Sequence, residues 1–541
     1  MEQCRQGSRG RPEMPELIYR PEFGTPFISD HDRILRSLSS GQLNGDRQIY
    51  IDKKFVDARH GKTKLILRYD LLSQSEIAER KKQSFDMALP FYGDTDKLDR
   101  SLKPVVIGFG PAGIFAALIL ARYGLEPIVI ERGSEMSSRV SQIDSFRQGR
   151  EGLDPECNIS YGEGGAGTFS DGKLFTGITS GLKGFVSETF ISHGADPDIL
   201  YDSHPHIGTD VLRDVIVGIR EEIRSLGGTV LFNARFDRFI TSGNSITGLE
   251  FTAKGSRHVM ECNRVILAIG NAGRDTFRYL HQDNVSMSSK SFAVGVRIEH
   301  RRSDIDTAQY GVDTLKTSNM SAANYKMSVD TNTGRKLYTF CMCPGGEVIN
   351  ASSGNGQAVV NGMSYRSRDL DNSNSALLIP VDEKDFGEDV LGGLIYQELL
   401  EKKAFAAAGS CGSVPVIRYE DLLRGRVSDH IGRIKPSVRP GYSFADFSEI
   451  FDRDQIDTLI DGISRMGRKI RGYDDPNSIL SAVESRSSSP VRILRDMDSR
   501  QSLSLTGLYP AGEGAGYAGG IMSSAIDGIN CANCLAKSLV K

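Results

Sequence analysis

The sequence predicts a multidomain α/β fold, in which a parallel sheet with covering helices is interrupted by a strand-rich α+β segment. A chain of 541 residues is too long for one compact core, at roughly 100–200 residues per domain. A strand, a glycine-rich turn, a helix and a second strand follow one another over residues 105–130, which is typical of parallel strands joined by a crossover. Between residues 286 and 490 the sequence becomes rich in Gly, Ser and Asn and favours strands, which indicates an inserted domain.

Composition places the chain among ordinary globular proteins, because 39% of its residues are hydrophobic and 25% are charged. The 66 Lys and Arg nearly balance the 69 Asp and Glu, so the charge disfavours a nucleic-acid partner. No apolar run approaches the ~18–20 residues of a transmembrane helix, and the first residues lack the apolar core of a signal peptide. We therefore expect a cytoplasmic protein with no transmembrane segment. The eight cysteines are thinly spread, which favours reduced thiols.

The N-terminal part predicts a tail and a small appended domain. Residues 1–16 show no periodicity and are expected to form a mobile tail. Residues 17–100 predict a small α/β domain and its linker. The expected elements are a helix capped by Asp30, strands at 49–51 and 64–67, and a charged linker at 77–100.

Residues 101–285 begin the nucleotide-binding part with a Gly108-Phe109-Gly110-Pro111-Ala112-Gly113 turn, which fits GxGxxG. The first glycine permits the tight turn, the second lets the backbone approach a pyrophosphate, and the third lets helix and strand pack closely. The helix N-terminus supplies free N–H groups to the phosphates. Glu131 ends the second strand, about 20 residues on, where a carboxylate accepts ribose hydroxyls. This acid favours FAD or NAD over NADP, because a 2′-phosphate would meet a negative charge.

The rest of the chain completes the predicted core. Thr209 or Asp210 is expected to cap a helix that ends at Gly227-Gly228. The further expectations are strands at 229–232, 246–251 and 265–269 that complete a parallel sheet and a β-meander, an inserted substrate or cap domain at 286–490, and a C-terminal return at 491–541 with a strand at 507–509 and a helix at 521–539.

Three segments resemble the two-dinucleotide-binding-domain flavoproteins, the glutathione-reductase-like class with a Rossmann-like core. They are Glu131-Arg132-Gly133, the strand Val265 to Gly270, and the run Gly507 to Gly514. The last resembles the C-terminal strand of that class, whose carboxylate holds the ribityl chain, with Glu513 in place of Asp. The resemblance implies FAD as the cofactor. It also implies that the helix opening at Gly520-Ile521-Met522 directs N–H groups at the N1–C2=O edge of the flavin.

The segment from Gly162 to Leu174, with its clustered glycines, resembles the signature of a narrower family. This family comprises uncharacterised bacterial FAD-dependent proteins labelled NAD(FAD)-utilising dehydrogenases. Small residues suit a loop pressed against an extended cofactor, and Thr, Ser, Asp and Lys side chains bind phosphate or a flavin edge. Similar stretches are Asp57-Ala58-Arg59, His206 to Asp210, Gly295 to His300, Phe340 to Gly346 and Ser487 to Arg492.

These patterns predict a cofactor site and a set of candidate proton donors; no metal site is predicted. The expected cofactor-binding residues are Gly108, Gly110, Pro111, Ala112, Gly113, Glu131, Arg132, Gly165, Gly167, Thr168, Ser170, Asp171, Lys173, Gly270, Gly512, Glu513, Gly520, Ile521 and Met522. The catalytic candidates are Lys173, His206, His300, Cys343 and Arg486, each of which has a structural role as the alternative interpretation. Arg486 and Arg492 are expected to hold an anionic substrate. Cys341 and Cys343 should alternate along a strand about 6.6 Å apart, which disfavours a disulfide.

The resemblance implies an FAD-dependent oxidoreductase acting on an unknown small-molecule or lipid substrate. Only one GxGxxG has its own strand and acid, so NAD(P)H, as an electron donor, would bind transiently in the substrate cleft. A redox partner protein is the alternative donor. Three other hypotheses stay open: an FAD-containing tRNA-modifying protein, a lipid reductase similar to the geranylgeranyl reductases, and a non-catalytic FAD-binding scaffold.

Overall fold

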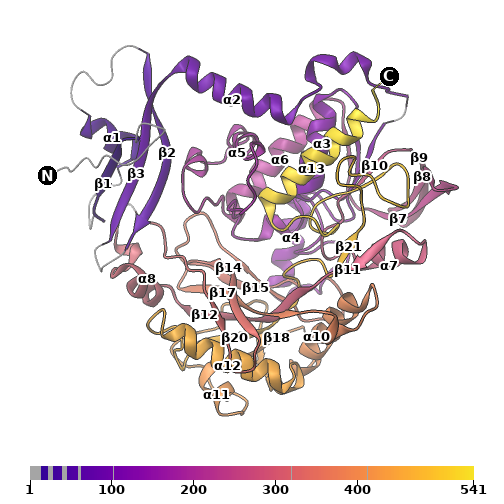
Figure 1. Cartoon of the computed structure of the whole chain (residues 1–541). Coiled ribbons are helices and arrows are strands. Elements are labelled where there is room, and N and C mark those ends of the chain that lie inside the picture. Colours follow the sequence, from indigo (N-terminus) through magenta and orange to yellow (C-terminus); the bar gives the residue numbers. More distant parts are fainter. Residues whose placement is uncertain are drawn as a thin grey trace.

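The computed structural model describes residues 14–21, 28–38, 46–58, 63–101, 103–317, 320–410 and 412–540. Figure 1 shows three regions. They are an N-terminal sheet, a parallel sheet covered by helices that include the C-terminal helix, and a large antiparallel sheet that lies below the parallel sheet in this view. Most of the segment expected to be a mobile tail lies outside the described residues, and its last residue, Glu16, begins strand β1.

A five-stranded parallel sheet forms the centre of the nucleotide-binding part. Its strands are short and almost wholly apolar, as expected for a parallel sheet buried on both faces. The order pairs the last strand of the chain with β10, so the C-terminal return completes the sheet begun some 400 residues earlier. In order across the sheet the strands are β22 (Leu508–Pro510), β10 (Val265–Leu267), β4 (Val105–Ile107), β5 (Ile128–Ile130) and β6 (Thr229–Leu231).

Three helices cover this sheet: α3 (Pro111–Arg122), α6 (Thr209–Ser225) and α13 (Ile521–Lys537). Helices α3 and α13 approach closely because the contact is built from small residues. A Cβ on Gly528 of α13 would lie 2.1 Å from the carbonyl oxygen of Ala112. The first residue of the last helix is thereby held beside the glycine-rich turn.

The cap expected for α6 is not formed by a side chain. The residue that precedes the helix is Gly208, and neither Thr209 nor Asp210 caps it. The Thr209 hydroxyl instead donates to the Thr168 carbonyl at 2.6 Å, and Asp210 accepts from the Arg366 backbone N–H at 2.8 Å. Both side chains thus tie the helix start to neighbouring loops.

The predicted β-meander is present as β7 (Ala234–Ser242), β8 (Ser245–Ala253) and β9 (Ser256–Glu261). The segment after it forms a seven-stranded sheet covered by α10 (Gly392–Ala407) and α12 (Arg453–Gly467). In order across that sheet the strands are β13 (Ser328–Asp330), β14 (Lys336–Cys343), β17 (Asn372–Val381), β12 (Phe292–Arg301), β20 (Ile479–Glu484), β18 (Val414–Arg418) and β19 (Tyr442–Phe444).

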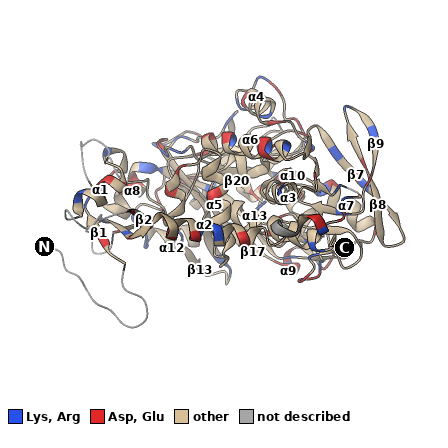
Figure 2. Ribbon diagram, turned by 90° about the horizontal axis from the view of Figure 1, so that it is seen from above, with Lys and Arg blue, Asp and Glu red and all other residues tan. Residues whose placement is uncertain are grey.

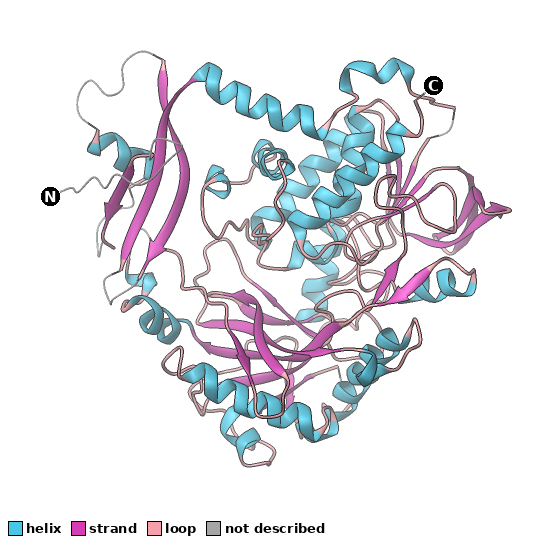
Figure 3. Cartoon of the chain, in the orientation of Figure 1, coloured by secondary structure: helices cyan, strands magenta, loops and turns pink. Residues whose placement is uncertain are grey.

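The N-terminal sheet has the order β1-β3-β2, built from β1 (Glu16–Tyr19), β2 (Arg47–Asp57) and β3 (Lys64–Ser73), with α1 (Asp30–Ser37) beside it. The cap of α1 is Ser29, one residue before the expected Asp30. The charged stretch expected to be a linker overlaps helix α2 (Gln74–Ala88), which Figure 3 shows bridging the N-terminal sheet and the part of the chain that holds the parallel sheet. A Ser73/Glu76 capping box starts α2, so a strong local helix signal prevails over the charged composition.

Shorter elements complete the described chain. They are α4 (Met136–Arg147), α5 (Leu182–Ser192), α7 (Arg274–Gln282), α8 (Arg302–Tyr310), α9 (Glu383–Phe386), α11 (Tyr419–Leu423), β11 (Met287–Ser289), β15 (Glu347–Asn350), β16 (Val360–Met363) and β21 (Val491–Ile493). Figure 2 shows Lys and Arg interspersed with Asp and Glu along the ribbon. Within the described residues, no helix has the length and apolarity needed to cross a membrane.

Candidate functional site

A cavity of about 1010 Å³ lies where the carboxyl ends of the parallel strands face the antiparallel sheet. This is the place where ligands bind in open parallel sheets. Most of the expected cofactor-binding residues line it; of the set predicted from the sequence, Gly113, Thr168 and Gly512 do not. Of the catalytic candidates, Lys173 and Arg486 line the cavity, whereas His206, His300 and Cys343 do not.

The three glycines of the GxGxxG turn have different surroundings. Gly108 has φ +94°, and a Cβ there would lie 2.4 Å from the Ala268 carbonyl oxygen. A Cβ on Gly113 would lie 1.9 Å from the Gly108 carbonyl oxygen. A Cβ on Gly110 meets only the Gly165 Cα, at 3.8 Å, so this side of the turn is open to the cavity. The first and third glycines are needed for packing, and the second leaves room for a ligand.

Glu131 joins this turn to the loop that follows it. Its carboxylate accepts backbone N–H groups from Phe109 and Gly162 at 2.8 Å and from Gly133 at 3.0 Å. Three charge-assisted hydrogen bonds hold the carboxylate firmly at the cavity wall. The side chain is therefore fixed where the predicted ribose site requires an acceptor.

Arg132, the next residue, lies at the edge of the cavity and is fully engaged with protein groups. Its guanidinium lies over the Tyr161 ring at 4.3 Å and pairs with Asp275 at 2.8 Å and Glu156 at 2.9 Å. These contacts hold Tyr161, another cavity residue, against the wall.

The glycine-rich segment from Gly162 to Leu174 packs directly on the GxGxxG turn. A Cβ on Gly165 would lie 3.0 Å from the Gly110 Cα, and one on Gly167 would lie 3.2 Å from Ile521. Thr168 points away from the cavity and donates to the Glu163 carbonyl at 3.3 Å. The clustered glycines therefore let three separate segments of the chain meet at one wall.

At the end of this segment, Asp171 and Lys173 contact the inserted domain. Asp171 is 1% exposed and accepts from the Arg368 Nε at 3.0 Å. Burial alone would raise the pKa of Asp171, but Arg368 and Lys173 hold it below its ordinary value. The Lys173 ammonium donates to the Met342 carbonyl and lies 3.9 Å from the Sγ of both Cys341 and Cys343.

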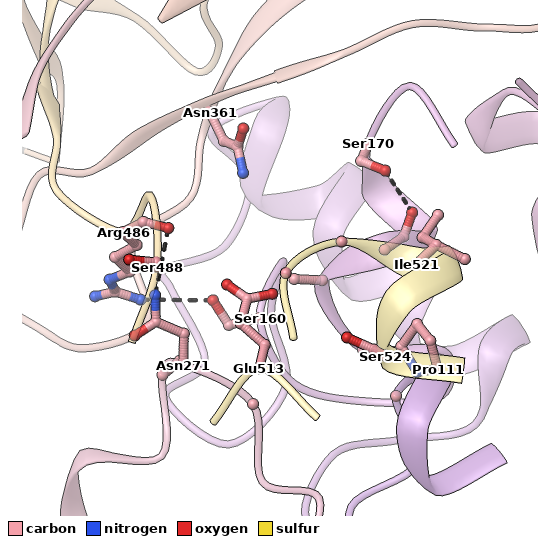
Figure 4. Close-up of a pocket in the computed structure, with 18 of the residues that line it drawn as sticks. Pro111, Ser160, Ser170, Asn271, Asn361, Arg486, Ser488, Glu513, Ile521 and Ser524 are labelled. Carbon is pink, nitrogen blue, oxygen red and sulfur yellow. Dashed lines mark hydrogen bonds between the residues drawn. The ribbon is translucent and has the colours of Figure 1, made fainter. Parts of the chain in front are cut away.

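Glu513 lies in the same cavity, next to Asn271 and the start of α13 (Figure 4). Burial raises the pKa of Glu513 to about 7, against hydrogen bonds from Gly520 and Asn271 and the charge of Lys290. Gly512, just before it, has its N–H bonded to Asp527 at 2.8 Å, and a Cβ there would lie 2.7 Å from the Ala112 Cβ. Gly512 thus serves helix packing rather than the cavity surface.

Arg486 enters the cavity wall from the return of the inserted domain, and its charge is already paired. It contacts Glu401 at 3.0 Å and donates to Ser353 at 2.7 Å; Figure 4 also shows its interactions with Ser160 and Asn271. Arg492, the other residue expected to hold an anion, lies over the Tyr517 ring at 5.2 Å. Without a ligand, the charge of Arg486 is therefore paired with the Glu401 carboxylate.

The two histidine candidates serve the packing of the protein. His206 bonds to the Arg366 carbonyl at 3.2 Å, and burial lowers its pKa to about 3. His300 bonds to the Tyr473 carbonyl at 2.6 Å, and burial lowers its pKa to about 4. Both rings are neutral at physiological pH and lie outside the cavity wall.

Sequence reasoning missed three polar residues that line the cavity, Ser160, Asn271 and Asn361. Glu484 and Ser488 also line it; they belong to the stretch that the sequence places at the return from the inserted domain, but no role was predicted for them. Sequence reasoning also missed the role of Arg297, which is fully buried and pairs with Glu484 at 2.9 Å. The available signal was that Arg297 directly follows the apolar residues 292–296 of β12, since a charge in a buried strand requires a buried partner.

Fold and cavity together define an α/β protein with a five-stranded parallel sheet, antiparallel sheets and a cavity between the parallel sheet and the large antiparallel one. The chain is 44% identical over 433 residues to an uncharacterised protein of Clostridium beijerinckii, and the match covers 80% of each chain. The chain belongs to the family of this clostridial protein. Residues 291–487, the inserted region, match the family described as "FAD-dependent protein, C-terminal domain-like".

Among the more distant similarities are a curated protein and a solved structure. A 178-residue stretch is 26% identical to the Escherichia coli K12 protein named "Probable electron transfer flavoprotein-quinone oxidoreductase YdiS", and it covers 32% of this chain and 37% of that protein. Among solved structures, a geranylgeranyl bacteriochlorophyll reductase-like protein of Thermoplasma acidophilum has 12% identity and a TM-score of 0.35, with 81% of this chain and 78% of that one covered.

Proposed function

We propose that this protein is an FAD-dependent oxidoreductase whose flavin occupies the cavity described above. One observation carries the proposal: segments far apart in the sequence, from the GxGxxG turn to the start of α13, converge on a single cavity wall. The family match over the inserted region and the distant flavoprotein relative support the same class.

The residues of the cavity fit the parts of FAD. The open side of Gly110, at the N-terminus of α3, suits the pyrophosphate, and the anchored carboxylate of Glu131 suits the adenosine ribose. Glu513 and the N-terminus of α13 suit the ribityl and flavin end. When bound, FAD supplies the two-electron chemistry.

The protein's own groups then orient the substrate, exclude water and move protons. Glu513 is the candidate proton acceptor that we favour, because it lines the cavity and burial raises its pKa to about 7. The substrate is taken to be a small molecule that enters the remaining part of the cavity. NAD(P)H or a redox partner protein is taken to supply electrons.

The test begins with the protein as purified. We expect heat-released cofactor to co-elute with FAD on chromatography, and we expect dithionite under anaerobic conditions to bleach the visible flavin band. NADH and NADPH are then tested as reductants in the same cell. Purified protein that neither carries nor takes up FAD, or whose bound FAD dithionite does not reduce, would contradict the proposal.

A further inference from the structure

Strand β14 departs from regular geometry at its two cysteines. The register with β17 shifts between Phe340 and Cys343, and Cys341 has φ +43°, in the left-handed region that side-chain-bearing residues rarely adopt. The regular alternation that would hold the two thiols about 6.6 Å apart therefore does not apply here. The expectation that a disulfide is disfavoured rested on regular strand alternation, and β14 does not have that alternation at Cys341.

The bulge brings both thiols around one lysine. Lys173 Nζ lies 3.9 Å from the Sγ of Cys341 and 3.9 Å from the Sγ of Cys343. The Cys343 thiol donates to the Cys341 carbonyl at 3.4 Å, and Arg297 Nη1 lies 3.9 Å from the Cys343 Sγ. Two cations therefore lie beside a pair of sulfurs.

The two thiols differ in access. Cys341 is half-buried and lines the cavity, whereas Cys343 is fully buried behind it. This arrangement suits a two-step exchange. The accessible thiol attacks a substrate, and the buried thiol then attacks the first sulfur and releases the substrate from it.

Electrostatics favour the thiolate at the accessible position. A hydrogen bond from Cys343, followed by the charges of Lys173 and Arg297, lowers the pKa of Cys341 well below its ordinary value, against burial and Asp171. Two further carboxylates, Glu484 and Glu513, also face this thiol. Lowered thiol pKa values of this kind mark reactive cysteines.

We propose that Cys341 and Cys343 are an attacking and a resolving thiol that reduce a low-molecular-weight disulfide within the cavity. The Cys341 thiolate attacks one sulfur of the substrate, the substrate S–S bond breaks, and the first thiolate leaves. Cys343 then attacks the Cys341 sulfur, releases the second thiol and passes its proton to a leaving thiolate. The products are a Cys341–Cys343 disulfide, one thiol and one thiolate, and the thiolate takes its proton from solvent water.

The disulfide is returned to two thiols by two electrons and two protons from a reduced flavin, which is oxidised. Only this return step rests on the proposed function. A disulfide is the substrate class that uses a second thiol, because a single nucleophilic cysteine would serve for other electrophiles. A small substrate follows from the position of Cys341 on a cavity wall.

The first test traps the attack with bis(2-hydroxyethyl) disulfide as the probe. In Cys343→Ser protein, we expect a stable mixed disulfide at Cys341, located by peptide mass spectrometry, whereas wild type should yield the Cys341–Cys343 disulfide. Cys262→Ser is the matched control, since Cys262 is fully buried and lies outside the cavity wall. Absence of the adduct in Cys343→Ser protein, or an adduct spread equally over other cysteines, would overturn the proposal.

The second test measures the reactivity of the Cys341 thiol without relying on turnover. Alkylation of Cys341 by iodoacetamide should be at least about tenfold faster at pH 7 than in a Lys173→Gln variant, and Lys173→Arg should restore most of the rate. Equal rates in wild type and Lys173→Gln would contradict the role of the cluster.

The third test follows the flavin band after anaerobic photoreduction and addition of the same disulfide. We expect the band to recover in wild type, because the disulfide reoxidises the flavin through the two thiols. We expect no recovery in Cys341→Ser protein. A protein without FAD fails the proposed function yet can still pass the trapping test; a protein with reducible FAD and no trapping fails the thiol proposal alone.

Discussion

At the scale of single residues, the glycines of the first turn show how one motif divides its tasks. Gly108 and Gly113 are required because any side chain would strike a backbone carbonyl oxygen at 2.4 Å or less. Gly110 has open surroundings, so the fold does not require a glycine there. A glycine is required only if a ligand must approach the backbone at this position. A substitution at Gly110 therefore separates ligand binding from folding.

We expect Gly110→Val to weaken FAD binding by at least about tenfold, or ~1.4 kcal/mol, while the thermal midpoint of the flavin-free protein stays close to wild type. The φ of −82° at Gly110 suits any residue, so backbone strain does not contribute. Fluorescence titration of the flavin-free protein measures the affinity. Gly152→Ala, where an added Cβ meets nothing within 4 Å, is the matched control. Unchanged affinity in Gly110→Val would place the pyrophosphate elsewhere.

Glu513 predicts a pH dependence of the flavin-free protein. Its folded pKa of about 7 lies above the ordinary 4.5, so the stability associated with its protonated form is full below pH 4.5 and is lost as pH rises through 7. The free energy of unfolding of Glu513→Gln, relative to that of wild type, should therefore rise by up to ~3 kcal/mol between pH 5 and pH 8. Urea denaturation at both pH values measures this difference. A gap that does not change with pH would show that Glu513 is ionised throughout.

At the scale of elements, the contact of α3 with α13 positions both ends of the predicted cofactor site. The two helices come from opposite ends of this part of the chain, and they meet where Gly528 of α13 lies against Ala112 of α3. Because the contact is between backbones, it cannot relax by a change of rotamer.

We expect Gly528→Ala to destabilise the protein by about 1–3 kcal/mol and also to weaken FAD binding, because its Cβ would lie 2.1 Å from the Ala112 carbonyl oxygen at the start of α3. Urea denaturation and flavin titration measure the two effects. Gly152→Ala again provides the comparison. A stable variant with normal affinity would mean that the helices separate without disturbing the cavity.

At the scale of the whole molecule, a buried ion-pair cluster ties the inserted domain to the nucleotide-binding part. Glu401 on α10 is fully buried and contacts Arg274 at the start of α7, which donates to it from two nitrogens, and Arg486, which follows β20. Burial would raise the pKa of Glu401, but Arg486 and Arg274 lower it to about 2.

Removing this carboxylate should loosen the two parts. We expect Glu401→Gln to cost about 3–5 kcal/mol at pH 7, because it leaves two arginines without their buried counter-charge. The contribution of Glu401 is present above pH 4.5 and is lost as pH falls toward 2, so the difference from wild type should shrink on acidification. Denaturation at pH 7 and pH 4, with limited proteolysis between the parts, measures it. Glu398→Gln, whose half-buried carboxylate on α10 pairs with Arg278 at 2.7 Å and lies 3.9 Å from Arg274, is the comparison; equal losses in both would remove the special role of Glu401.

Local signals predicted the nucleotide-binding part well. The strands around Gly108, the helix after it and the late strand at 507–509 were all predicted, since each has its own periodicity or turn signature. Local sequence failed where burial and contacts with distant residues decide the outcome. His300 has the same residue type as a catalytic base, but a neighbouring carbonyl and full burial give it a packing role. Helix α2 was not predicted, because its charged residues are typical of a linker although a Ser73/Glu76 capping box starts a helix there.

By itself, the sequence determined the class of this protein: the GxGxxG turn, its acid and the late glycine-rich run are local patterns whose chemistry follows from their residues. Only the tertiary structure decided what meets inside the cavity. A β-bulge places Cys341 and Cys343 beside Lys173, which lies some 170 residues away in the chain. Glu401 forms an ion pair with Arg486. Such pairings depend on the register and packing of distant segments, which no short stretch of sequence encodes.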